Sequence, residues 1–69
     1  MQASVHPSVT DPTVRAAVDR LAAEFAGRAS PDLVDHVVRG SRRDLDVVPA
    51  AALPEMVERL ARQRLIDAL

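Results

Sequence analysis

Three stretches of this chain repeat apolar residues at intervals of three and four, and a proline stands near the start of each stretch. Such spacing places the apolar side chains on one face of an α-helix. Proline suits a first helical turn because the N–H groups there have no intrahelical acceptor. No segment alternates polar and apolar residues at the period of a strand. The pattern predicts an all-α fold, a small up-down-up three-helix bundle with helices near 12–26, 31–46 and 50–67.

The ends of the first helix carry clear signals. Thr10 or Asp11 supplies an N-cap oxygen, Pro12 fits the first helical position, and Gly27 suits the residue that follows a helix. Residues 1–9 show no sustained period, so we expect a flexible tail at 1–9 and the bundle domain at 10–69. Within the first helix, Arg20 and Glu24 are spaced to form an ion pair on the solvent side.

The other two helices differ in how well their starts are marked. Ser30 is a good N-cap for the second helix, with Pro31 after it. The third helix has two possible starts, because Pro49 and Pro54 both suit a first turn. Glu58 lies four residues before Arg62, an orientation that favours an ion pair on the outward face.

The apolar stripes predict the core. Its expected members are Val14, Val18, Leu21, Phe25, Val34, Val37, Val38, Leu45, Val57 and Leu60. On the third helix, Leu53, Met56 and Ala61 are expected to face inward as well. Ser41 lies in the middle of the second stripe, where we expect its hydroxyl to bond back to the carbonyl of Val37 rather than to act as a nucleophile.

The chain has 69 residues and no cysteine. A chain this short buries only about 60% of the surface that its unfolded form exposes and is marginally stable, so it usually needs disulfides, a metal or a partner subunit. Without cysteine, disulfides and thiolate metal sites are excluded. His6 and His36 have no companions at ligand spacing, so we expect no metal and no other cofactor. A partner subunit remains as the source of extra stability.

Signatures of catalysis are nearly absent, and we expect no enzyme and no small-molecule substrate. Gly27 and Gly40 are the only glycines, so there is no glycine-rich loop to hold phosphate. His36 is expected on the solvated side of the second helix, without a cleft around it. The acidic residues are scattered and mostly matched by arginine four residues away, so no carboxylate pair for acid–base chemistry is indicated.

A small DNA-binding regulatory domain is the alternative function, because three-helix domains often read DNA. Arg39, Arg42 and Arg43 form the only basic cluster. Acidic residues interleave with these arginines and the net charge is −1, which favours a solvated, salt-bridged face over a nucleic-acid partner. The mixed charge also argues against a membrane-surface role. No signal peptide or membrane-length apolar run is present, so a cytoplasmic location is expected.

Three segments together resemble a known family. They are VRAAVDRLAAEFA at 14–26, the positions Pro31, Val34, Val37, Val38, Ser41 and Leu45, and LP at 53–54 with VERLAR at 57–62. They are similar to the actinobacterial three-helix-bundle dimerisation domain found at the N-terminus of low-molecular-weight-phosphatase-type arsenate reductases and tyrosine-phosphatase-like proteins. The phosphate-binding loop of those enzymes requires a cysteine, which this chain lacks. The resemblance therefore implies a dimerisation module without the catalytic activity, either free-standing or an N-terminal domain.

Some apolar residues fall outside the three inward stripes. Leu33, Leu65, Ile66 and Leu69 are of this kind, and Gly40 offers a point of close approach beside Leu33. A two-fold interface covers such a patch with its own copy. The sequence therefore predicts a non-catalytic dimerisation or protein-interaction module, with a homodimer or another protein as the partner.

Overall fold

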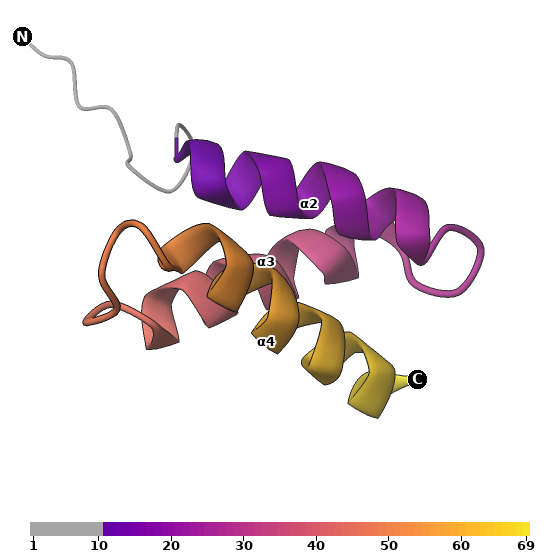
Figure 1. Ribbon diagram of the computed structural model, residues 1–69. Helices are drawn as coiled ribbons and strands as arrows, with labels where there is room; N and C mark the ends of the chain where they lie inside the picture. Colours follow the sequence, from indigo (N-terminus) through magenta and orange to yellow (C-terminus); the bar gives the residue numbers. More distant parts are fainter. Residues whose placement is uncertain (1–10) are drawn as a thin grey trace, which may run out of the picture.

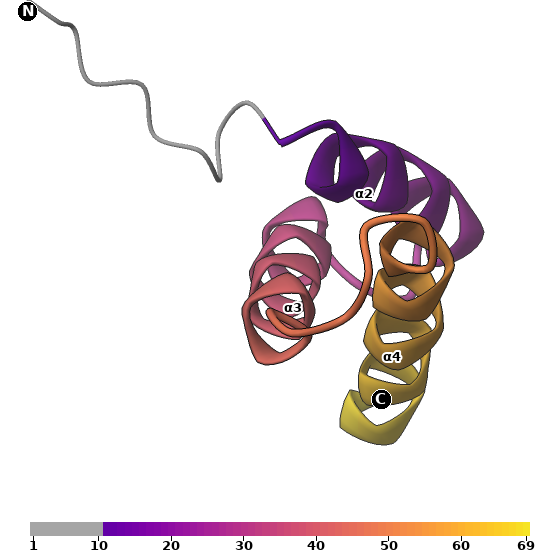
Figure 2. The ribbon, with the colours of Figure 1, turned by 60° about the vertical axis from the view of Figure 1, so that its left-hand side comes forward.

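The computed structural model describes residues 11–69, which form three α-helices that pack against one another in every pair (Figure 1). Helix α2 spans Pro12–Glu24, α3 spans Pro31–Asp44, and α4 spans Leu53–Ala68. Helix α3 runs opposite to α2 and α4, and the three helices enclose one core (Figure 2). The predicted all-α three-helix bundle is confirmed. The expected tail at 1–9, His6 and the alternative cap Thr10 lie outside the described residues.

Helix α2 begins as predicted and ends two residues early. The side chain of Asp11 caps it, because its Oδ1 accepts the N–H of Thr13 at 2.9 Å. Phe25 is the C-cap, so the last helical residue is Glu24 rather than residue 26. Gly27 has a φ of 82°, a left-handed conformation that a side chain would strain. This glycine lets the chain reverse towards α3.

Helix α3 is capped at its start by Ser30, whose Oγ accepts the N–H of Leu33 at 3.1 Å. Its last helical residue is Asp44 and its C-cap is Leu45, so the predicted end at residue 46 is also too late. The N–H of Leu45 divides between two carbonyls of the last turn at 3.2 Å each. Such shared bonds are typical of a helix terminus that tightens before it stops.

Helix α4 begins at Leu53 with Pro54 in its first turn, so of the two proposed starts the later one is correct. The expected start near residue 50 is wrong because the preceding residues form tight turns. The N–H of Ala52 bonds to the carbonyl of Pro49 at 3.0 Å, and that of Leu53 bonds to Ala50 at 3.3 Å. These hydrogen bonds join residues three apart in the sequence, and they bend the chain between α3 and α4 instead of extending a helix.

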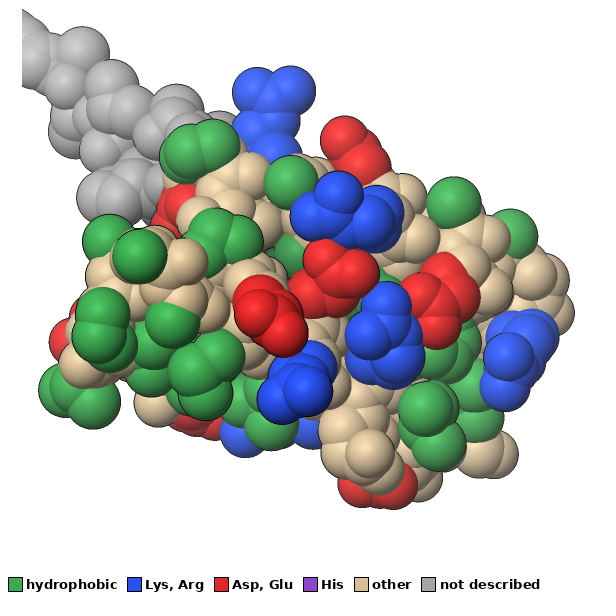
Figure 3. All heavy atoms as spheres, viewed as in Figure 1, with side chains coloured by type: hydrophobic (Ala, Val, Ile, Leu, Met, Phe, Trp, Pro, Cys, Tyr) green, Lys and Arg blue, Asp and Glu red, His purple; other side chains and the backbone are tan. Residues whose placement is uncertain are grey.

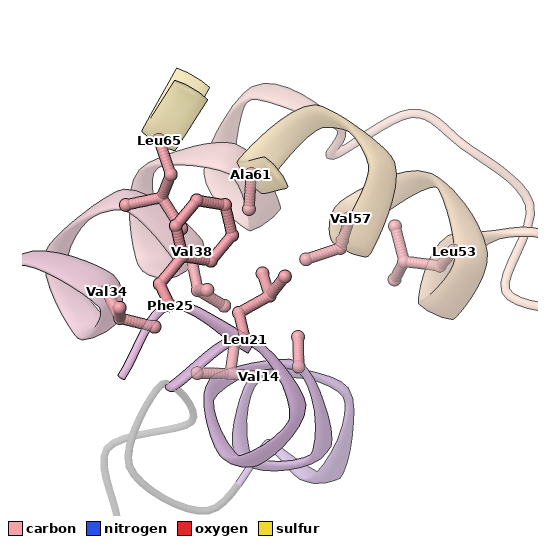
Figure 4. Packing of buried hydrophobic residues seen from close by; sticks show 10 residues of the cluster. Val14, Leu21, Phe25, Val34, Val38, Leu53, Val57, Ala61 and Leu65 are labelled. Carbon is pink, nitrogen blue, oxygen red and sulfur yellow. The ribbon is translucent and has the colours of Figure 1, made fainter. Parts of the chain in front are cut away.

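The core draws on all three helices and on the residue that follows α2 (Figure 4). Its buried members are Val14, Ala17, Leu21, Phe25, Val34, Val38, Leu53, Val57, Ala61 and Leu65. Three predicted core residues, Val18, Val37 and Leu45, are half-buried and pack against this cluster, and Leu60 is half-buried. None of helices α2 to α4 is long and apolar enough to cross a membrane.

Two assignments on α4 are wrong. Leu65 is completely buried, although it was expected outside the core, and Met56 is 41% exposed, although it was expected to face inward. The buried residues of α4 are spaced four apart from Leu53 to Leu65, so they form one slowly turning stripe. Met56 lies about 100° away from Val57 around the helix and falls outside that stripe. The stripe continues to Leu65, whose side chain lies beside Phe25 and Val38 (Figure 4).

Gly40 and Ser41 are neighbours in the middle of α3, and the packing of the bundle explains only Ser41. Ser41 is fully buried, and its Oγ donates to the carbonyl of Val37 at 2.8 Å, as predicted. Gly40 is half-buried, and a Cβ built there would lie 3.8 and 4.0 Å from guanidinium nitrogens of Arg43 and Arg64. These are ordinary contacts with flexible side chains. Close approach of a neighbouring helix within the bundle therefore does not explain Gly40.

Phe25→Ala should lower the free energy of unfolding by about 3–5 kcal/mol, because Phe25 is 1% exposed and its removal leaves a cavity. A domain of this size has little more stability than that, so the variant should be largely unfolded. Val47→Ala is the matched control, since Val47 is 93% exposed. Thermal and urea denaturation followed by circular dichroism would measure both variants. A Phe25→Ala protein that melts like the parent would contradict the assigned core.

Candidate interaction surface on helix α4

The residues predicted to form an interface differ in how far solvent reaches them. Leu65 is buried in the core and cannot contribute, because its stripe on α4 is turned inward. Leu33 is half-buried and packs against the core, and it lies on α3 with Gly40. Ile66 and Leu69 are 49% and 54% exposed at the end of α4. Of the five residues, only this last pair remains as exposed apolar surface.

The solvent-facing side of α4, here called the outer face, carries more apolar surface than predicted. Met56, Arg59, Gln63 and Ile66 are all exposed and follow one another at intervals of three, four and three residues. That spacing is a heptad pattern, which aligns side chains along one side of a helix. In Figure 3, hydrophobic side chains gather towards both ends of α4, with charged side chains between them. The four-residue spacing from Leu53 to Leu65 is the sequence signal that could have shown this face.

A network of ion pairs joins α4 to α2 along one side of the outer face. The Nε of Arg20 on α2 lies 2.7 Å from the carboxylate of Glu58 on α4. The Nη2 of Arg62 lies 3.1 Å from the same carboxylate. Arg62 also holds Glu24 of α2, with its Nε and Nη2 each 2.9 Å from a different carboxylate oxygen. Such a two-point contact between guanidinium and carboxylate fixes direction as well as distance.

The network replaces one predicted pair and contains another. The pair Glu58–Arg62 forms within α4 as predicted. Arg20 and Glu24 do not pair with each other, because each instead binds a residue of α4. The hydrogen bonds from Arg62 lower the pKa of Glu24, and in turn the bond to Glu24 raises the pKa of Arg62. Both side chains therefore hold their charge more firmly than they would alone.

A shallow hollow of about 390 Å³ lies beside this network, towards the start of α4. Its lining residues are Arg20, Pro54, Glu55, Glu58, Arg59 and Arg62. Arg59 and Glu55 make no ion pair with any other residue of 11–69. The guanidinium and carboxylate groups of this lining are suited to holding a charged or polar side chain.

The remaining charged residues are spread over the bundle. Arg39 is paired with Asp35 at 2.9 Å and Arg42 with Asp11 at 3.1 Å, while Arg43 is exposed. Two of the three arginines of the alternative DNA-binding cluster thus already hold carboxylates, which weakens their attraction for phosphate. His36 is exposed on α3, and residues 11–69 contain no group of three acidic or histidine side chains placed to hold a metal.

The ion-pair network predicts a pH dependence of stability. Because folding lowers the pKa of Glu24, its contribution is complete above the ordinary value of 4.5 and is lost as the pH falls through the lower value of the folded chain. Between about pH 7 and pH 3, the melting temperature of Glu24→Gln should therefore fall less than the melting temperature of the parent chain. Glu55→Gln removes a carboxylate that has no ion pair in residues 11–69, so its melting temperature should fall as much as that of the parent chain. An equal loss in the parent and in Glu24→Gln would contradict the assigned role of the network.

Comparisons with protein-family models, with curated proteins and with solved structures find no match to this chain.

Proposed function

We propose that this chain is a non-catalytic helical interaction module that pairs with a second copy of itself. The exposed apolar surface of α4 carries this proposal. Met56, Ile66 and Leu69 are 41%, 49% and 54% exposed. Met56 and Ile66 lie on α4, the helix that also supplies the largest share of the core, and Leu69 is its C-cap. A helix that is apolar on its outer face as well as on its inner face is typical of one that is covered on both sides.

Because the core of the bundle is small, covering this exposed apolar surface would add substantially to the stability of the chain. The buried side chains are mostly valine, alanine and leucine around one phenylalanine, and the large apolar residues left exposed among residues 11–69 are Val47, Met56, Ile66 and Leu69. Met56, Ile66 and Leu69 are each already about half covered, so covering them completely contributes about half of the roughly 1.5–3 kcal/mol that burial of a fully exposed side chain gives. Association costs remove much of that gain, which leaves pairing in the micromolar range.

The chemistry of the described surface supports an interaction role over a catalytic one. The hollow beside α4 is lined by arginine, glutamate and proline, without a nucleophile and a base in reach of each other. The resemblance to the actinobacterial dimerisation domain of arsenate reductases and phosphatase-like proteins points to the same class of function. A dimer would also supply the stability that a disulfide or a metal supplies in other short chains.

Self-association should appear directly as a mass. Light scattering after size exclusion should give about twice 7.5 kDa at high protein concentration, and the melting temperature should rise with concentration. The interface is apolar at its centre, so added salt should change the mass distribution only modestly. A mass that stays at 7.5 kDa at about millimolar protein would refute self-association.

Ile66→Glu should move the chain towards the monomer, because it places a charge in the apolar centre of the proposed interface. Ile66 is half-exposed in the single chain, so the substitution should leave the helix content unchanged. Val47→Glu is the matched control, since it makes the same change at an exposed valine outside α4. Sedimentation of both variants at one concentration would compare them. Equal weakening by both variants would point to a general effect of net charge.

A further inference from the structure

We infer that the second copy lies antiparallel to the first along the outer face of α4, with Ile66 of each copy packed on Met56 of the other. This inference rests on the proposed function and adds to it the direction and the register of the two helices. It comes from three observations: the heptad spacing of the outer face, the distribution of its charges, and the position of the hollow beside α4.

The spacing of the exposed residues sets the register. The residues of the outer face fall on the a and d positions of a heptad, which are the positions that meet across a pair of helices. These residues are Met56, Arg59, Gln63 and Ile66. In an antiparallel pair, residues whose numbers add to the same sum lie opposite each other. When Met56 lies opposite Ile66 of the second copy, Arg59 lies opposite Gln63. The apolar residues then form the two end layers, and the polar residues form the two middle layers.

The charges on the outer face select the antiparallel direction over the parallel one. A parallel pair places Arg59 directly beside Arg59 of the second copy, and like charges in contact are unfavourable. In the antiparallel pair, Arg59 instead faces Gln63 of the second copy. Within each chain, the side-chain amide of Gln63 donates a hydrogen bond to the carboxylate of Asp67 at 3.1 Å. Arg59 makes no ion pair in residues 11–69, so it is available for this carboxylate. Antiparallel helices also oppose their dipoles.

The hollow gives a second, independent reason for the same direction. It lies at the first turns of α4, on the side of Arg62, beside Pro54. Leu69 follows Arg62 by seven residues, which is two helical turns, so it lies on that same side at the opposite end of α4. Antiparallel pairing brings Leu69 of each copy to the hollow of the other, where Pro54 and the aliphatic stems of the arginines can contact it. Parallel pairing would leave Leu69 at the end of the pair away from the hollow of the other copy.

Disulfide cross-linking tests the direction and register, and the chain is well suited to it because it has no cysteine of its own. Met56→Cys, Ile66→Cys and the double variant should be oxidised at the same concentration and compared on a non-reducing gel. Antiparallel pairing predicts that the double variant forms a covalent dimer, and that a mixture of the two single variants does so too. Each single variant alone should remain uncross-linked, since its two cysteines lie at opposite ends of the interface.

The outcomes separate this inference from the proposed function. A dimeric mass together with a covalent dimer of Ile66→Cys alone would establish the parallel direction and overturn the inference while leaving dimerisation intact. A dimeric mass without any cross-link would place the interface elsewhere and also overturn it. A parent chain that stays monomeric would refute the proposed function and the inference together.

Charge reversal gives a second measurement that does not depend on oxidation. Arg59→Glu should weaken dimerisation, because it sets a carboxylate against Asp67 of the second copy. Adding Asp67→Arg to that variant should restore it, since the two charges have then exchanged places. Both residues are exposed in the single chain, so circular dichroism should show an unchanged fold. Failure of the second substitution to restore dimerisation would contradict the proposed contact.

Discussion

The packing of one phenylalanine determines how the rest of this bundle is arranged. Phe25 is the only aromatic residue of the chain, and it is the largest of the fully buried side chains. Its ring lies where the end of α2, the middle of α3 and the end of α4 meet, beside Val38 and Leu65 (Figure 4). The guanidinium of Arg28 lies 5.3 Å from the ring centre, in range of a cation–π contact at the edge of the core. The ring is thus enclosed from several directions.

The rotation of α4 about its own axis follows from this contact. Leu65 and Phe25 are buried in the same core cluster, and the inward stripe of α4 continues from Leu53 through to its last turns. The same rotation turns Met56 and Ile66 outward, since they lie well away from that stripe around the helix. The exposed apolar surface that supports the proposed dimer is therefore a consequence of how the core is filled.

The sequence was enough to predict the number and the starts of the first two helices, because their signals are local. Asp11, Ser30 and the prolines act within one helical turn, and Ser41 bonds to a carbonyl only four residues away. The helix ends were less certain, since Phe25 and Leu45 continue the apolar pattern although they are already C-caps. The candidate surface was predicted only in part. Ile66 and Leu69 are exposed as expected, whereas Leu65 depends on the distant Phe25, which periodicity within one helix does not report.

The ion pairs show the same division between local and distant information, and they connect it to the surface. Spacing within one helix predicts Glu58–Arg62 correctly, but it cannot show that Arg20 and Glu24 face α4. Once α4 packs against α2, these carboxylates are occupied by arginines of the same chain. Arg59, one turn away on the outer face, has no such carboxylate within residues 11–69. The fold thus pairs the charges that lie between α2 and α4 and leaves the cation of Arg59, between Met56 and Gln63, on the face where we propose that a second copy binds.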